Sequence, residues 1–151
     1  MTVFALPLPP SSNHGYKQVW HWNRRKGRMQ SRPGKTNELV LWEDKARIIL
    51  GGYAPPEHTR LRLDIDIYVP AVALRTEDLS GFLKFLEDAV VGNRRDQWID
   101  HEALHRYPAE GCRYVEALRL AHGLIAGKSP DLYREIVEQR RLAVVLVERC
   151  P

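Results

Sequence analysis

The residues from Arg60 to Val69, RLRLDIDIYV, alternate between polar and apolar side chains almost without interruption. Because successive side chains of a β-strand point to opposite faces of a sheet, this alternation predicts a half-buried strand. The core face of that strand would carry Leu61, Leu63, Ile65 and Ile67. Asp64 and Asp66 would lie on the other face, either as a pair of metal-binding acids or as the solvated charges that are common on strands.

Two more strands are expected near the ends of the chain. The segment VFALPL, residues 3–8, is apolar and β-prone and stops where Pro9 and Pro10 remove backbone donors. The segment RLAVVLVER, residues 141–149, supplies a last strand. A shorter segment, HEALHRY, fits either a short helix or a strand.

Helices are predicted between these strands. Residues 37–50 have apolar side chains at helical spacing, with Asn37 as a possible N-cap and Gly51 as a stop. A second helix begins near Leu79 and ends at Gly92 and Asn93, and residues 112–139 form an extra helix-rich segment broken at 127–130. In the second helix the expected buried residues are Leu79, Phe82, Leu83, Leu86 and Val90, and the outward ones Ser80, Lys84, Glu87 and Asp88.

The pattern as a whole predicts an α+β fold, a small mixed sheet flanked by helices. At 151 residues, 44% hydrophobic and 28% charged, the chain suits a single domain spanning residues 1–151. Cys112 and Cys150 form no CxxC pair, which argues against a zinc ribbon or a disulfide scaffold. With no signal-like start and no membrane-length apolar run, the expected compartment is the cytoplasm, with no membrane partner.

Positive charge is concentrated in a polar loop predicted for residues 11–36. Every charged residue from Lys17 to Lys35 is basic: Lys17, Arg24, Arg25, Lys26, Arg28, Arg32 and Lys35. Such a block repels itself and is typical of polyanion binding, although a solvated, partly disordered loop is the alternative. Tyr16, Trp20 and Trp22 lie among these charges, and their rings could stack on unpaired bases; alternatively, the two tryptophans pack the loop onto the core.

A candidate active site lies in TEDLSGFLKFLEDAV, residues 76–90. Asp78 precedes a helix N-terminus, where unpaired N–H groups and the helix dipole favour a carboxylate that could hold Mg²⁺ beside a phosphate. Lys84 lies one turn beyond Ser80, where an ammonium group would neutralise charge on a scissile phosphate. The alternative is an ordinary amphipathic helix with an acidic start.

Several of these pieces occur in the order of one known family. LPLPPSSNHGY near the N-terminus contains a PPSxN motif that ends at Asn13, and it is followed by the basic loop, the alternating strand, DLSGFLKFLEDAVVG, Asp96 and the final RLAVVLVE strand. In this order the chain resembles the RusA-type Holliday junction resolvases, which are small endodeoxyribonucleases. The family spacing D-x-D-N-x-x-K-x-x-x-D falls on Asp78, Ser80, Gly81, Lys84 and Asp88.

The resemblance implies a homodimer that binds four-way DNA junctions and cuts two strands symmetrically with Mg²⁺. Asp78 and Asp96 would be the metal ligands and Lys84 the phosphate-facing cation, with DNA contacts from Asn13 and from the basic loop. The chain departs from the pattern at Ser80, Gly81 and Arg95, where the family has two acids and an asparagine. A divergent or catalytically weakened DNA-binding member is therefore an alternative function.

Distance limits which acids could share an ion. Ten residues of helix would place Asp88 about 15 Å from Asp78, so Asp88 is interpreted as a surface acid or a partner of Lys84. The return to Asp96 is also short, since an extended chain spans only about 3.3–3.6 Å per residue. An early helix end, a different role for Asp96, or a site shared between two subunits would each resolve this.

A competing motif is HEALH, which matches the HExxH pattern of zinc proteases. On a helix, His101 and His105 would lie one turn apart as zinc ligands and Glu102 would act as the base. A third ligand would have to be Glu116 or His122, and Pro108 closes any helix soon after the second histidine. If the segment is a strand, the two histidines lie too far apart to share one ion easily.

Overall fold

The computed structural model describes residues 2–55, 61–70, 72–73, 77, 79–91, 101–106 and 112–149, with the backbone alone at 12, 13, 101–106, 112 and 113. Its strands are β1 (Thr2–Leu6), β2 (Tyr16–Asn23), β3 (Arg28–Lys35), β4 (Leu61–Tyr68), β5 (His101–Arg106) and β6 (Leu142–Arg149). Its helices are α1 (Ser12–Gly15), α2 (Asn37–Leu50), α4 (Leu83–Val91), α5 (Cys112–Ala121) and α6 (Pro130–Gln139), with a 3₁₀ turn η1 (Leu79–Phe82) and a π-helical turn η2 (His122–Ala126).

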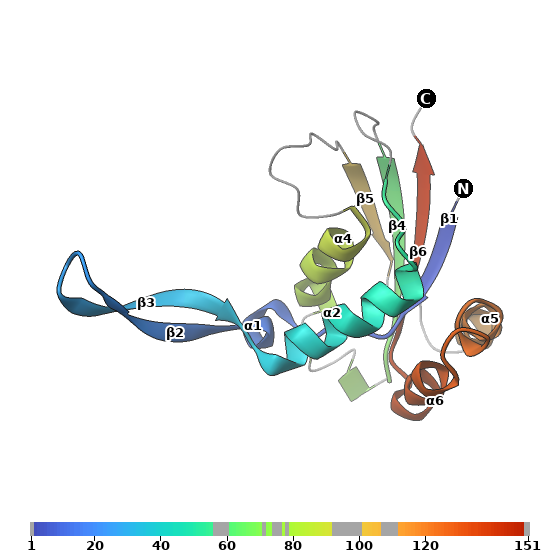
Figure 1. The fold of residues 1–151 in the computed structure, drawn as a ribbon. Helices are drawn as coiled ribbons and strands as arrows, with labels where there is room; N and C mark the ends of the chain where they lie inside the picture. The colour runs from blue at the N-terminus through green and yellow to red at the C-terminus, as the bar shows by residue number, and fades with distance from the viewer. Residues whose placement is uncertain are drawn as a thin grey trace.

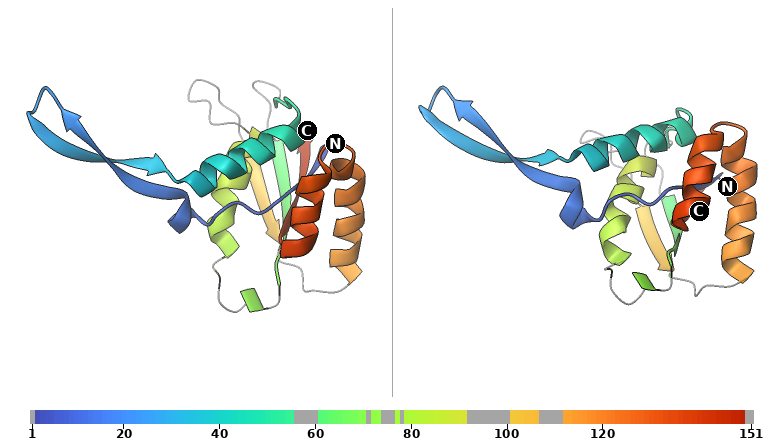
Figure 2. Two further views of the ribbon diagram at one scale, coloured as in Figure 1. Left: turned by 60° about the horizontal axis from the view of Figure 1, so that its bottom comes forward. Right: turned by 90° about the horizontal axis from the view of Figure 1, so that it is seen from below.

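A four-stranded mixed sheet forms the centre of the molecule. Its strand order is β1-β6-β4-β5, in which β6 is antiparallel to both of its neighbours and β4 is parallel to β5. Figures 1 and 2 show helices α2 and α4 packed together on one side of this sheet and α5 and α6 beside β1. The predicted α+β fold, a mixed sheet flanked by helices, is confirmed.

The alternating strand is β4, at an inner position of the sheet. Leu61, Leu63, Ile65 and Ile67 are all fully buried, as the pattern predicts. Ile65 is opposite Val145 of β6, which is itself opposite Phe4 of β1, so one apolar row crosses three strands. The ring of Phe4 meets Tyr53, just after α2, at 5.0 Å. The core therefore lies between this face of the sheet and the layer of α2 and α4.

The other face of β4 carries the two predicted acids. Both Asp64 and Asp66 are half-buried, and Asp64 accepts an ion-pair contact from Arg62 at 3.3 Å. Asp66 also makes an interaction within the structure. No group of three possible metal ligands is formed by these acids or by any other side chains in the described part of the chain.

The N-cap of helix α2 lies one residue earlier than the sequence suggests. Thr36, and not Asn37, is the N-cap: its hydroxyl accepts a hydrogen bond from the Leu39 N–H at 3.3 Å. Gly51 ends the helix in the left-handed conformation with φ of 60°, as predicted. The N-cap role assigned to Asn37 is therefore corrected, because the threonine is the last extended residue before the helix.

The extra helical segment packs at the other end of α2. Lys45 of α2 forms an ion pair of 2.6 Å with Glu135 of α6, and Lys128 donates to the Ile49 carbonyl at 3.4 Å. Ala121, Ile125 and Ile136 are buried in the common core. Residues 112–139 thus belong to the same domain as the sheet, and no helix in the described ranges has the length and apolar character needed to cross a bilayer.

Candidate nucleic-acid interface

The prediction of a loop over residues 11–36 is wrong, because most of this basic segment forms an antiparallel β-hairpin. Strands β2 and β3 pair in register from Tyr16 opposite Lys35 to Asn23 opposite Arg28. The turn between them is closed by a hydrogen bond of 2.8 Å from the Gly27 N–H to the Asn23 carbonyl, and Gly27 has a positive φ of 61°. We call residues 16–35 the arm; it extends well away from the rest of the molecule (Figure 1).

The register of the arm separates its side chains onto two faces. Residues directly opposite in an antiparallel pair share a face, as do alternate residues of one strand. One face, the aromatic face, carries Tyr16, Trp20, Trp22 and Met29. These four side chains belong to exposed residues, with Trp20 64% and Trp22 58% exposed. The interpretation that the tryptophans pack a loop onto the core is therefore wrong.

The opposite face and the tip of the arm carry most of its positive charge. Lys17, Arg28 and Arg32 lie on this second face, which we call the basic face, and Arg24, Arg25 and Lys26 form the turn. All six are exposed. Within the basic face, Asn23 donates to the side chain of Gln30 at 2.7 Å, a diagonal contact between the two strands next to the turn. The predicted DNA-binding cations are thus held on a paired ribbon.

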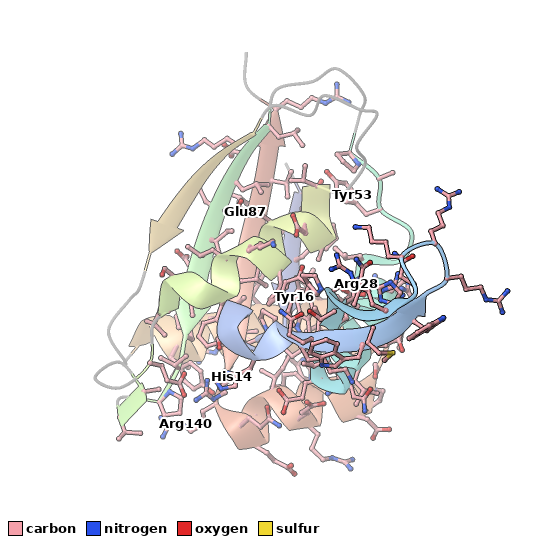
Figure 3. All side chains as sticks on the ribbon, turned by 90° about the vertical axis from the view of Figure 1, so that its left-hand side faces the viewer. His14, Tyr16, Arg28, Tyr53, Glu87 and Arg140 are labelled. Atoms are coloured by element: carbon pink, nitrogen blue, oxygen red, sulfur yellow. The ribbon has the colours of Figure 1, made fainter. Side chains whose placement is uncertain are left out.

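The root of the arm is fixed by contacts to three helices. The Thr36 N–H and hydroxyl donate to the Gly15 and His14 carbonyls at 3.0 and 2.9 Å. Lys35 forms an ion pair with Glu43 of α2 at 2.9 Å. On the other side, the Tyr16 ring lies 5.6 Å from the ring of Phe85 in α4. Figure 3 shows Tyr16 where the arm meets α4.

Gly15 allows this close approach of the root to α4. A Cβ atom at Gly15 would lie 2.3 Å from Cζ of the buried Phe85 ring, so the ring or the root would have to move. We expect Gly15→Ala to lower the free energy of unfolding by about 1–3 kcal/mol through overpacking. Urea denaturation measures this. Gly123→Ala is the matched control, because a Cβ there meets nothing within 4 Å, and its stability should be equal or higher.

Lys84, the predicted phosphate-facing cation, lies beside this root. Its side chain is exposed and its Nζ atom is 4.9 Å from the centroid of the Tyr16 ring. A cation over an aromatic face is attracted by the ring quadrupole, and this contact directs the ammonium group towards the arm. The structure thereby brings together two elements of the prediction, the helix cation and the basic segment. Phe85, whose ring packs against Tyr16, is buried, which the sequence pattern did not predict.

The remaining predicted site residues are placed less fully. Asp78 and Asp96 lie outside the described residues, so their roles as metal ligands stay predictions. Asn13 lies in α1 next to the root, and only its backbone is described. Among the described side chains, no group of three potential metal ligands is found.

The zinc-protease interpretation of HEALH loses its geometric basis. The segment forms β5, in which residues four apart are separated by about 13 Å. His101 and His105 are therefore not one helical turn apart, and Glu102 is not between them on a helix surface. The physical reason is pairing: β5 aligns with β4 along its full length, from Leu61 opposite His101 to Asp66 opposite Arg106.

Glu77, next to Asp78 in the sequence, is held by a two-pronged ion pair. Its carboxylate accepts hydrogen bonds from Arg141, the residue before β6, at 2.9 and 2.5 Å. The hydrogen bond from Arg141 lowers the pKa of Glu77, against the opposing effect of burial. Glu77, two residues before η1, is thus anchored beside the sheet.

This pair predicts a pH dependence of stability. A carboxyl group whose pKa is lower in the folded state stabilises the fold above its unfolded pKa, near 4.3, and the stabilisation is lost as the pH falls through the folded value. We expect Glu77→Gln to cost about 1 kcal/mol at pH 7, since the pair is partly exposed, and progressively less as the pH falls through the folded pKa of Glu77. Denaturation of both proteins across pH 2.5–7 tests this; a constant difference would contradict it.

Comparison with known protein families found no family model that matches this chain, and comparison with curated proteins found no similar sequence. The likeness to RusA-type resolvases therefore stays a prediction carried by the motif residues. The arm, its root and Lys84 are the structural basis from which a function can be inferred.

Proposed function

We propose that this protein is a magnesium-dependent endonuclease that binds four-way DNA junctions and cuts them as a homodimer. The observation that carries the proposal is the arm, a projecting two-stranded ribbon with cations along one face and around its tip. Contacts from lysine and arginine to phosphates supply most sequence-independent affinity for DNA. The major groove of B-DNA also admits a two-stranded ribbon.

The shape of the arm supports contact with DNA. Because the arm extends away from the body, both of its faces and its tip can approach a duplex without a clash with the domain (Figures 1 and 2). Cations on the basic face would follow phosphates, while the aromatic face would meet bases left unpaired at the centre of a junction. The fixed root keeps the arm in one direction relative to α4.

The cleavage part of the proposal rests on Lys84 and on the motif around it. DNA held along the arm would pass its root, where Lys84 is exposed and could neutralise charge on a phosphate. The resemblance implies that Asp78 and Asp96 hold Mg²⁺, which lowers the pKa of an attacking water. Paired cuts in a symmetric junction need two sites, which is the reason to propose a two-fold dimer.

Cleavage of synthetic DNA tests this function. The protein is incubated with a labelled four-way junction or a linear duplex of the same arm sequence, in Mg²⁺ or in EDTA. We expect symmetric nicks in the junction with Mg²⁺ alone, abolished by Asp78→Asn or Lys84→Met. Asp131→Asn is the matched control, because Asp131 is a highly exposed acid on α6, and it should leave cutting unchanged. Cutting that survives Asp78→Asn would overturn the site assignment.

A second candidate is a DNA-binding protein that does not cut. It is favoured by Ser80, Gly81 and Arg95, which replace two acids and an asparagine of the family spacing. Under this alternative the junction is bound more tightly than the duplex, and no nick appears in Mg²⁺ or Mn²⁺. Equal affinity for the junction and the duplex would argue against junction specificity in both candidates.

A further inference from the structure

A cavity of about 330 Å³ lies between α2 and α4, next to the root of the arm. The buried rings of Trp42 and Phe85 line its inner end, and Ala46 and Ala89 leave room because their side chains are small. The more accessible aromatic lining is provided by Tyr16 and Tyr53. The indole N–H of Trp42 already donates to the Pro7 carbonyl at 2.7 Å, so the ring is fixed in place. This volume is at the lower end of the range for small-molecule sites in proteins.

Charged groups surround the opening of this cavity. Lys35 and Arg47 contribute cations, and Glu43 and Asp88 contribute carboxylates. Lys35 forms an ion pair with Glu43, and Arg47 forms one with Asp44 at 2.8 Å. The side chains of both cations are largely exposed. Exposed ion pairs of this kind are weak, so a phosphate can replace the carboxylate as partner at little cost.

The cavity also offers hydrogen-bonding groups suited to a heterocycle. Carboxylates at the opening can accept hydrogen bonds from N–H groups, and Tyr53 is a lining residue whose hydroxyl can donate or accept. Burial raises the pKa of Tyr53, with a smaller opposing effect of the Arg149 charge. Aromatic side chains, donors, acceptors and cations at the rim are together the groups that recognise a base with its phosphate.

The cavity is continuous with the arm. Tyr16 and Lys35, which line it, are the first and last residues of the arm and face each other in the strand register. Tyr16 is also part of the aromatic face. A DNA strand that follows the aromatic face towards the root would therefore reach two residues of the cavity lining, Tyr16 and Lys35.

We propose that this cavity binds one unpaired nucleotide of the DNA that the arm holds. The base would lie against the accessible rings of Tyr16 and Tyr53, and its phosphate would contact Lys35 and Arg47. This inference rests on the proposed function for the source of the nucleotide, but the chemistry of the cavity can be tested without a junction. An extruded base is most available where pairing is interrupted, as at a junction centre or a gap.

The test uses the full chain and two probes. The first probe is dAMP, titrated by tryptophan fluorescence against deoxyribose 5-phosphate and inorganic phosphate. The second is a gapped duplex with a single unpaired 2-aminopurine. We expect dAMP to bind at least about tenfold more tightly than either phosphate compound, and 2-aminopurine fluorescence to change on binding.

Matched variants separate the cavity from general effects. Ala89→Leu fills the cavity, and Ala126→Leu places the same change at another half-buried helical alanine outside it. Arg47→Gln removes a rim cation, and Arg134→Gln removes an exposed arginine that likewise pairs with an aspartate three residues away. We expect both cavity variants to weaken dAMP binding about tenfold or more and both controls to leave it unchanged.

The outcomes distinguish this inference from the proposed function. Binding of dAMP that is lost in Ala89→Leu supports the site even if the protein neither binds nor cuts junctions, in which case the nucleotide is a free one. Junction binding with no dAMP binding, and with equal 2-aminopurine signals in wild type and Ala89→Leu, overturns the site and leaves the proposed function standing. Binding of phosphate as tight as dAMP would reduce the cavity to an anion site and also overturn the proposal.

Discussion

Replacing Arg24, Arg25 and Lys26 together by glutamine is expected to weaken DNA binding several hundredfold at 0.1 M salt. These three exposed cations form the tip of the arm. Each phosphate contact contributes about 0.9 to the slope of log K against log salt, so three contacts change the slope by about 2.7. Because log K is linear in log salt, a slope smaller by 2.7 lowers log K by about 2.7 between 1 M and 0.1 M salt. With equal affinities at 1 M, the loss of affinity at 0.1 M is roughly 500-fold.

Salt titrations of binding to a fluorescent duplex and to a four-way junction measure both quantities. The matched control replaces Arg119, Lys128 and Arg134 by glutamine, which removes the same charge from exposed positions on the α5–α6 segment. If the arm is the interface, the control changes neither the slope nor the affinity by more than a few-fold. Equal effects of the two triple variants would show that net charge, and not the arm, determines DNA binding.

Ile65→Ala is expected to lower the free energy of unfolding by about 2–5 kcal/mol, a large part of the stability of a domain of this size. Ile65 is fully buried at the centre of β4, between β5 and β6 and beneath the layer of α2 and α4. Truncation removes buried apolar surface and leaves a cavity that the surrounding sheet cannot close.

Urea denaturation followed by circular dichroism gives this difference, with a similar dependence on denaturant in both proteins as the sign of an intact fold. Ile65→Val, which removes one methylene group and keeps the β-branched shape, should cost only about 0.5–1.5 kcal/mol. A loss from Ile65→Ala no larger than that of Ile65→Val would mean that β4 is not central to the core.

The elements predicted best were those whose hydrophobic period is enforced by burial. β4 follows a two-residue period because one face packs on α2 and α4, and the η1–α4 segment follows a helical period for the same reason. Phe85 departs from that period because α4 is also covered from the side by the root of the arm. A contact with an element distant in sequence leaves no mark on local periodicity.

The arm was missed because neither of its faces is buried. Without burial, a strand need not alternate between apolar and polar residues, and the charges of this segment suggested a loop. Local signals were present in the β-prone residues Val19, Trp20 and Trp22 and in Gly27, which ends the turn in the left-handed conformation. The HEALH motif shows the reverse case, since a short motif match has no power to choose between a helix and a strand that pairs with β4.

The candidate site could be predicted in part. The side-chain pattern placed Lys84 on an exposed stripe, and the charge pattern identified the cations of the arm. What the sequence could not give was their proximity, which depends on Gly15 and Tyr16 packing on Phe85. The cavity beside them likewise depends on alanines of two helices that are far apart in the chain, so no local sequence pattern predicts it.

If the arm binds DNA as proposed, its length sets how far along the DNA one molecule can reach. Each strand has eight residues, which at about 3.3 Å per residue gives a span of about 26 Å. That length corresponds to about eight base-pair steps of 3.4 Å each. Because the tip cations lie at the far end of this span, a nuclease-protection footprint would extend beyond the globular body on one side, and a two-fold dimer would lengthen it in opposite directions.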